Sequence, residues 1–162
     1  MSETKTEAAP IRVGEVAPDF TLKDQTGEDV TLSSFRGSRH VVLVFYPESF
    51  TSICSVQMPG YNQAHQRWED QEAQVLGISV DSPAVHKAFA EYIGGIDFPL
   101  LADFYPHGAV AAAYGILRPN GVAERATIVV DKAGIVRHVD VHPIGGVPDR
   151  APAIEALRAL NR

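Results

Sequence analysis

Cys54 carries the most reactive side chain in this sequence, and it is the sequence's one cysteine. A thiol attacks as the thiolate, whereas a free cysteine, with a pKa of about 8.5, is mostly protonated at neutral pH. Thr51 precedes Cys54 by one helical turn, so its hydroxyl can reach the Cys54 amide, the sulfur, or an oxygen bound beside the sulfur. Pro47 can shield the sulfur from water without adding a competing donor. Together, these residues could activate a cysteine nucleophile.

A strand-to-helix crossing must position these residues. The apolar run 41–45 does not alternate, which indicates a strand covered on both faces, and Pro47 should end it. Ser49, Thr51 and Ser52 are candidate N-caps of a following helix, whose unpaired amides and partial positive charge favour a thiolate. A lone cysteine is more often a small buried apolar residue, and local sequence leaves that alternative open.

The helix after Cys54 has an interrupted apolar pattern. Its expected buried face consists of Ile53, Val56, Tyr61, Ala64 and Trp68. Pro59 removes one helix hydrogen bond, so we expect a kink there rather than a stop. We expect Phe45 and Trp68 in the core and Phe50 in a pocket wall.

The remaining chain alternates between strands and helices. We expect a hairpin at 20–32, a buried strand at 75–80, a helix from Pro83 to Gly94, a short strand at 98–102, a helix from Pro106 to Gly115, strands at 127–130 and 135–141, and a last helix capped by Asp149. Asp81 or Ser82 should cap the helix at Pro83. The order predicts one α/β domain at 11–162, with a central mixed sheet flanked by helices, after a flexible tail at 1–10. Sites in such sheets form beyond the carboxyl ends of strands.

Composition limits the classes of function. A net charge of -6 and a pI of about 5.4 argue against a nucleic-acid partner. No apolar run approaches the ~20 residues of a membrane span, and MSETKTEAAP lacks the apolar core of a secretory signal. A single cysteine excludes an intrachain disulfide, a CxxC pair and a multi-cysteine zinc site. We therefore expect no membrane partner and a cytoplasmic location.

Other motifs give weak signals. His138, Asp140 and His142 alternate along an expected strand, a spacing that can hold a metal, but a polar solvent-facing surface is the favoured interpretation. GxSxG, P-loop and GxGxxG motifs are absent, so hydrolase and nucleotide-binding functions have no support. We expect neither a metal nor a cofactor.

The segment PESFTSIC, residues 47–54, matches the P-x-x-x-T-x-x-C signature of peroxiredoxins. The blocks VLVFYP, ISVDS, PLLAD, GAVAAAYG and RATIVVD resemble that family in the same order, over roughly residues 13–141. The resemblance implies a thioredoxin fold and thiol-dependent reduction of hydroperoxides. It implies that Pro47, Thr51 and Cys54 form the active-site loop and that Arg125, by itself an ordinary surface charge, is the active-site arginine.

The resemblance is to one-cysteine members, notably the alkyl hydroperoxide reductase E-like branch. It implies that Cys54 becomes a sulfenic acid, which an external thiol must reduce: a low-molecular-weight thiol, a glutaredoxin-like protein or thioredoxin. The substrates would be hydrogen peroxide and organic hydroperoxides. Family members are commonly homodimers. Many members have glutamate at the position of Gln57, which puts an electrostatic role there in doubt.

Two alternatives belong to other classes of function. A peroxide sensor or chaperone-like binding protein would use the same oxidisable Cys54 but would not be recycled efficiently. An inactive thioredoxin-fold interaction module would not form a sulfenic acid, and the intact set of Pro47, Thr51, Cys54 and Arg125 argues against it.

Overall fold

A computed structural model describes residues 9–162, so most of the tail predicted at 1–10 lies outside the described residues. A five-stranded sheet in the order β5-β4-β3-β6-β7 forms the centre. Its strands are β3 (His40–Phe45), β4 (Ala73–Ser79), β5 (Leu100–Ala102), β6 (Ala126–Val130) and β7 (Val136–Val141). β3, β4 and β5 are mutually parallel, whereas β6 runs antiparallel to β3 and to β7. The predicted mixed sheet is confirmed.

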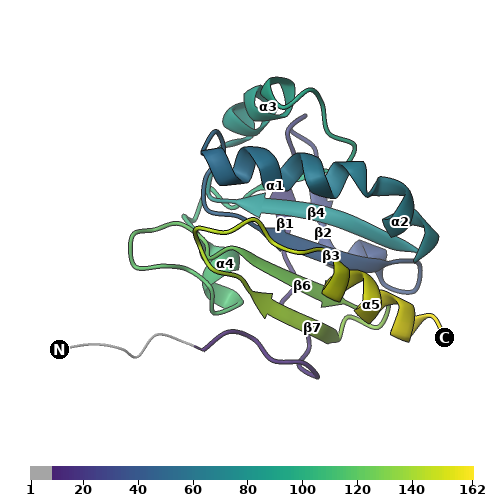
Figure 1. Cartoon of the computed structure of the whole chain (residues 1–162). Helices are drawn as coiled ribbons and strands as arrows, with labels where there is room; N and C mark the ends of the chain where they lie inside the picture. The colour runs from purple at the N-terminus through teal and green to yellow at the C-terminus, as the bar shows by residue number, and fades with distance from the viewer. Residues whose placement is uncertain (1–8) are drawn as a thin grey trace.

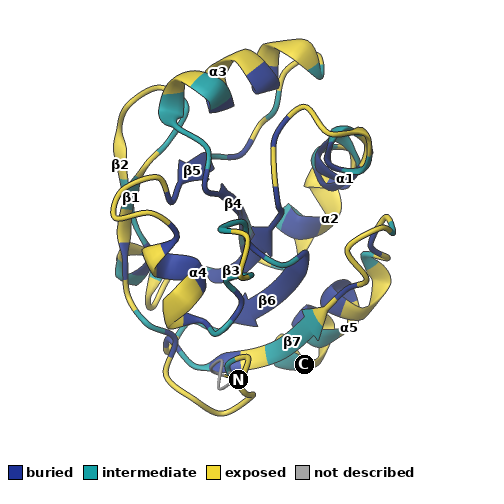
Figure 2. Cartoon of the chain, turned by 90° about the vertical axis from the view of Figure 1, so that its left-hand side faces the viewer, coloured by how far each residue is buried: buried dark blue, intermediate teal, exposed yellow. Residues whose placement is uncertain are grey.

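Helices cover the sheet in two layers. They are α1 (Ser52–Gln63), α2 (His65–Asp70), α3 (Pro83–Tyr92), α4 (Ala109–Ala113) and α5 (Ala151–Leu160). In Figure 1, α1, α2 and α5 lie on one side of the sheet, and the turned view in Figure 2 shows α4 and the hairpin on the other side. Two apolar clusters fill the spaces between the layers, one on each face of the sheet. This arrangement is the predicted α/β architecture.

The predicted N-terminal hairpin is also present, as a separate two-stranded sheet. Its strands β1 (Thr21–Lys23) and β2 (Asp29–Thr31) pair antiparallel, with Leu22 opposite Val30. A 3-10 turn, η2 (Leu32–Phe35), follows β2. Leu22 and Val30 pack against the apolar cluster on the α4 side of the central sheet. The hairpin therefore covers the sheet face opposite α1.

β3 occupies the middle of the sheet because its side chains are apolar on both faces. Val41, Leu43 and Phe45 enter the cluster on the α4 side, while Val42 and Val44 enter the cluster beneath α1. Every residue of β3 is buried. Parallel pairing with β4, in which Phe45 lies opposite Ile78, brings the carboxyl ends of both strands to one edge. The loops that follow these strands therefore lie next to each other.

The buried face predicted for the helix after Cys54 is wrong at Val56, whereas Tyr61, Ala64 and Trp68 are buried as predicted. Val56 is 58% exposed, whereas the buried side chains are those of Cys54, Gln57, Met58 and Tyr61. The spacing of Cys54, Met58 and Tyr61 by four and three residues makes them one face, which α1 turns towards the sheet. The helix passes through Pro59 and continues to Gln63, so the prediction that the proline does not stop it is confirmed.

The expected core aromatics are buried. Phe45 and Trp68 are almost fully excluded from solvent. Trp68 lies on α2, stacks on Tyr61 with 5.7 Å between ring centroids, and donates its indole N–H to the Tyr61 carbonyl at 3.0 Å. This contact ties the end of α1 to α2. Within residues 9–162, no helix has the length and apolar character needed to cross a membrane.

Candidate active site

Cys54 lies in the first turn of α1, directly beyond the carboxyl end of β3. Its side chain is 0% exposed and belongs to the apolar cluster that also contains Val44, Tyr46 and Met58. Thr51 occupies the N-cap position with extended backbone dihedrals. The sulfur therefore combines burial with nearness to the amides that begin a helix, where a negative charge is favoured.

Arg125 reaches Cys54 from the start of β6, the strand that pairs with β3 on the side away from β4. It directly precedes β6, and the antiparallel register that pairs Phe45 with Ala126 brings Arg125 beside the end of β3. Its Nη1 donates a hydrogen bond to Cys54 Sγ at 3.2 Å, and the side chain is buried. The structure thus brings together two residues that are 71 positions apart in the sequence.

Two neutral acceptors hold the guanidinium. Nε and Nη2 of Arg125 donate to the Ile144 carbonyl at 3.1 and 3.0 Å, and Nη1 also donates to Gln57 Oε1 at 2.5 Å. Among the described residues, Arg125 makes no hydrogen bond to a carboxylate. Its positive charge therefore remains available to Cys54. The sequence raised doubt about Gln57 but did not reveal this contact, and it gave no signal for Ile144, which acts through its backbone.

Thr51 and Pro47 lie in the loop that joins β3 to α1. The Thr51 hydroxyl donates to the Glu48 carbonyl at 2.8 Å, and the described residues contain no hydrogen bond between this hydroxyl and Cys54. The Thr51 hydroxyl thus binds neither the Cys54 amide nor the sulfur. The expected partner that is left is an oxygen of a ligand bound beside the sulfur. Pro47 is buried next to Tyr46, whereas Thr51 is exposed. The loop therefore presents one hydroxyl to solvent and one apolar ring to the interior.

Asp81 binds this loop instead of capping α3. Its Oδ2 accepts hydrogen bonds from the Ser49 amide at 2.9 Å, the Ser49 hydroxyl at 2.8 Å and the Ser79 hydroxyl at 2.6 Å. Ser82 caps α3 by accepting from the Val85 amide, which decides between the two predicted caps. The sequence pattern marked Asp81 only as a possible cap and gave no signal for its contact with the loop before α1.

His86 extends this network into the core and makes stability depend on pH. Burial lowers the pKa of His86 to about 4, although the Asp81 carboxylate opposes the shift. The unfolded chain binds the proton near pH 6.5. Stability should therefore fall as the pH drops from about 6.5 to about 4, by about 3 kcal/mol in total. Chemical unfolding at pH 7 and pH 4.5 should show a smaller loss in His86→Gln, which cannot titrate; equal losses in both proteins would contradict this expectation.

Phe50, expected in a pocket wall, packs on α3. Its ring centroid lies 5.2 Å from that of Phe89 and 5.3 Å from that of Tyr92. The side chain remains 47% exposed. Its φ of 68° lies in the left-handed region, which bulky residues rarely adopt. The surrounding contacts must therefore stabilise this conformation.

His142, the residue directly after β7, contacts the backbone of Arg125. His142 donates its backbone amide to the Arg125 carbonyl at 2.7 Å, and its Nε2 hydrogen-bonds Thr127 Oγ1 at 2.9 Å. Thr127 in turn contacts the Tyr61 hydroxyl at 2.8 Å. Burial lowers the pKa of His142. Across residues 9–162, histidine, cysteine and acidic side chains form no group of three suited to a metal.

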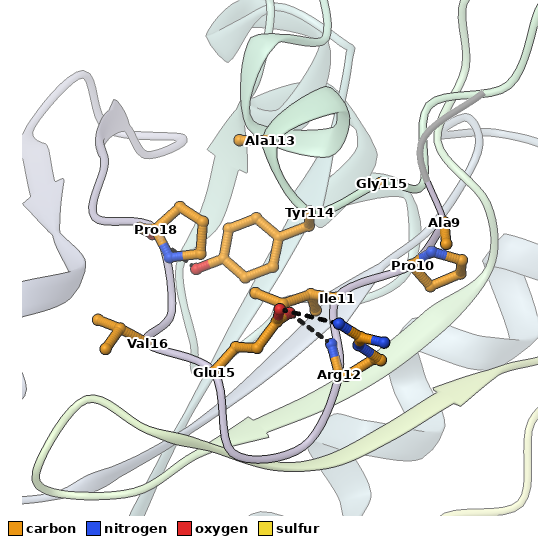
Figure 3. Close-up of a pocket in the computed structure, with 10 residues that line it drawn as sticks. All are labelled: Ala9, Pro10, Ile11, Arg12, Glu15, Val16, Pro18, Ala113, Tyr114 and Gly115. Carbon is orange, nitrogen blue, oxygen red and sulfur yellow. Dashed lines mark hydrogen bonds and ion pairs between the residues drawn. The ribbon is translucent and has the colours of Figure 1, made fainter. Parts of the chain in front are cut away.

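A surface hollow of about 690 Å³ lies elsewhere. Figure 3 shows its lining, in which the Tyr114 hydroxyl donates to the Pro18 carbonyl and Arg12 pairs with Glu15. Tyr114 belongs to the apolar cluster on the α4 side of the sheet, opposite the cluster that contains Cys54. The lining of this hollow therefore contains neither Cys54 nor Arg125.

The sequence matches the AhpC/TSA family over residues 13–139, which is more than half of the chain. The chain belongs to this family. Alkyl hydroperoxide reductase E of Mycobacterium tuberculosis is 43% identical over 152 residues, covering 93% of this chain and 99% of that protein. The one cysteine of this chain fits a one-cysteine peroxiredoxin.

Solved peroxiredoxin structures share the architecture. The reduced 2-Cys peroxiredoxin of Plasmodium vivax superposes with a TM-score of 0.87 at 28% identity, over 94% of this chain and 83% of that one. Peroxidoxin BcpB of Mycobacterium tuberculosis gives a TM-score of 0.81 at 30% identity, over 94% and 99% of the two chains. The expected thioredoxin-like fold and the thiol-dependent peroxidase function are confirmed.

Proposed function

We propose that Cys54 is the nucleophile of this peroxidase, and that Thr51, Arg125 and Pro47 complete its catalytic site. The carrying observation is the hydrogen bond of 3.2 Å from Arg125 Nη1 to the buried Sγ in the first turn of α1. Peroxide chemistry requires a thiolate, and the Arg125 guanidinium and the helix-start amides are the positively polarised groups beside this sulfur. The substrates are hydrogen peroxide and organic hydroperoxides.

In the oxidising step, the Cys54 thiolate attacks the terminal oxygen of ROOH. The S–O bond forms as the O–O bond breaks, and the departing RO⁻ takes a proton to become ROH. Negative charge grows on the departing oxygen, so donors aimed at it lower the barrier. A guanidinium has five N–H donors, and Arg125 directs four of them to Ile144, Gln57 and Cys54. The second hydrogen of Nη2 remains for the substrate.

Thr51 has the complementary role of an acceptor. Because its hydroxyl gives its hydrogen to the Glu48 carbonyl, its oxygen can accept the O–H of a hydroperoxide and orient the terminal oxygen towards sulfur. Pro47 excludes water from the sulfur side of the loop and offers no N–H that would compete for the thiolate.

Thr51→Val should slow Cys54 oxidation by about 10–100-fold, because valine keeps the shape of threonine but cannot bind the hydroperoxide. Thr51→Ser should stay within about threefold of the wild type, since its hydroxyl can make the same contacts. Single-turnover oxidation by hydrogen peroxide gives both rates, and thermal unfolding checks that both variants are folded. Equal rates in Thr51→Val and the wild type would remove Thr51 from the site.

An external thiol completes the cycle by reducing the Cys54 sulfenic acid, first as a mixed disulfide and then by thiol exchange with a second thiol. The candidate reductants are a low-molecular-weight thiol, a glutaredoxin-like protein and thioredoxin. We also propose a cytoplasmic homodimer, on the family resemblance and on the single cysteine. Light scattering coupled to size-exclusion chromatography tests the dimer.

Rapid mixing tests the proposed function directly. Reduced protein is mixed with hydrogen peroxide or an organic hydroperoxide, the sulfenic acid at Cys54 is trapped and identified by mass, and each candidate thiol is then added. We expect fast oxidation and return to the thiol with at least one reductant. Oxidation without return would favour a peroxide sensor, and a Cys54 that does not oxidise would favour an inactive interaction module.

A further inference from the structure

We propose that Asp81 is a positioning residue for peroxide reduction, which holds the loop from Tyr46 to Thr51 in its reactive conformation. The proposal rests on the proposed function of Cys54. Asp81 lies between β4 and α3, and its carboxylate accepts two hydrogen bonds from Ser49 in the loop before α1. Asp81 touches neither the sulfur nor, in this proposal, the substrate.

The direction of each hydrogen bond follows from the chemistry of its partners. An ionised carboxylate only accepts, so the hydroxyls of Ser49 and Ser79 both donate to Asp81 Oδ2. Each hydroxyl then has only lone pairs left, so the Tyr46 hydroxyl donates to Ser49 at 3.2 Å and His86 Nε2 donates to Ser79 at 2.7 Å. In both chains of side chains, Tyr46 to Ser49 and His86 to Ser79, each hydrogen bond is therefore donated in the direction of Asp81 Oδ2.

Backbone strain next to Ser49 gives this network a mechanical role. Phe50 follows Ser49 and has a φ of 68°, a backbone conformation that is strained for a bulky non-glycine residue. Two bonds from Ser49 to Asp81 hold the chain before the strained residue, and the Phe50 ring is held by Phe89 and Tyr92 of α3. Both anchors belong to the segment between β4 and the end of α3, which contains none of the proposed catalytic residues.

Thr51 follows Phe50 and is the N-cap of the helix that carries Cys54. Releasing Ser49 from Asp81 allows Phe50 to relax to a negative φ, which changes the direction in which the chain enters α1. The Thr51 hydroxyl and the cover over Cys54 then move together. Loss of the Asp81 contacts should therefore slow attack on peroxide and expose the sulfur to other reagents.

The test compares Asp81→Ala, Asp81→Asn and Asp131→Ala in the full chain. Asparagine keeps one oxygen that can accept the three hydrogen bonds but removes the charge. Asp131 is the matched control, because its carboxylate also accepts three hydrogen bonds, from the Ala133 amide, the Ile135 amide and Arg137 Nε, in the turn at the other end of β6. The two readouts are the rate of Cys54 oxidation by hydrogen peroxide and the rate of alkylation of reduced Cys54 by iodoacetamide.

We expect Asp81→Ala to oxidise at least about tenfold more slowly and to be alkylated faster, because the loop loses the contacts that orient it. Asp81→Asn should lie near the wild type, and Asp131→Ala should lose stability without changing either rate by more than about twofold. Ser49→Ala keeps the hydrogen bond from its backbone amide to Asp81 and loses the one from its hydroxyl. It should also oxidise more slowly and be alkylated faster, by smaller factors than Asp81→Ala. This variant replaces Asp81→Ala in the test if Asp81→Ala does not fold.

The proposal is overturned if the variants that remove the Ser49 contact keep wild-type rates. It is equally overturned if Asp81→Asn behaves as Asp81→Ala, which would assign the effect to charge, or if Asp131→Ala reproduces the effect, which would assign it to global stability. Failure of the proposed function has a different signature, since Cys54 of the wild type would then react slowly with peroxide.

Discussion

Cys54→Ser should show a complete loss of thiol-dependent peroxide turnover. A serine hydroxyl is not ionised at neutral pH and cannot pass through a sulfenic acid, so both halves of the cycle are lost. The replacement is nearly isosteric, and the serine oxygen can accept the hydrogen bond from Arg125 Nη1 that now goes to sulfur. The fold should therefore survive. Peroxide consumption in the presence of a thiol reductant measures the effect.

Ser55→Ala is the control for this experiment. Ser55 is the next residue of α1 and is partly exposed, so its substitution changes the same helix without touching the sulfur. Its turnover should stay within about twofold of the wild type. Turnover that persists in Cys54→Ser would show that the reaction does not pass through this residue, and the proposed site would have to be abandoned.

Arg125→Met should slow the oxidation of Cys54 by about 100–1,000-fold, the range found when one donor to a developing oxyanion is removed. Methionine has nearly the length of arginine but no donor and no charge. It leaves the buried Gln57 Oε1 without its partner, at a cost of about 1–3 kcal/mol in stability. Single-turnover oxidation separates the rate effect from later reduction, and denaturant unfolding measures the stability effect.

Two further variants separate charge, geometry and stability. Arg125→Lys keeps a positive charge but not the planar set of donors, so it should recover only part of the lost rate. Arg118→Met removes a partly exposed guanidinium that pairs at 2.9 Å with Glu124, the residue directly before Arg125. This variant should change the oxidation rate by no more than about twofold. A wild-type oxidation rate in Arg125→Met would refute the role proposed for the guanidinium.

The sequence by itself determined the order of strands and helices and the part of the site that lies within one short segment, from Pro47 to Cys54. The unbroken apolar run of β3 requires cover on both faces, and Pro47 and the hydroxyls after it mark the change from strand to helix. The spacing of Thr51 and Cys54 within one turn is likewise a local property. The buried face of α1 could not be read in the same way, because the burial of Gln57 depends on a partner, Arg125, that is remote in sequence.

Local sequence could not show which distant groups meet Cys54: the family resemblance implied Arg125, and only the tertiary structure shows the contacts and their cause. Arg125 reaches the sulfur because β6 pairs antiparallel with β3 in a register that matches Ala126 with Phe45. Its second anchor is the carbonyl of Ile144, a group that every residue type possesses and that no sequence pattern can mark. Asp81 satisfies the expected pattern of a helix cap, yet it binds the loop before α1, because parallel pairing brings the ends of β3 and β4 together. Strand order and register are cooperative properties of the whole sheet, so local sequence could supply the thiol and its hydroxyl but not the remaining contacts around them.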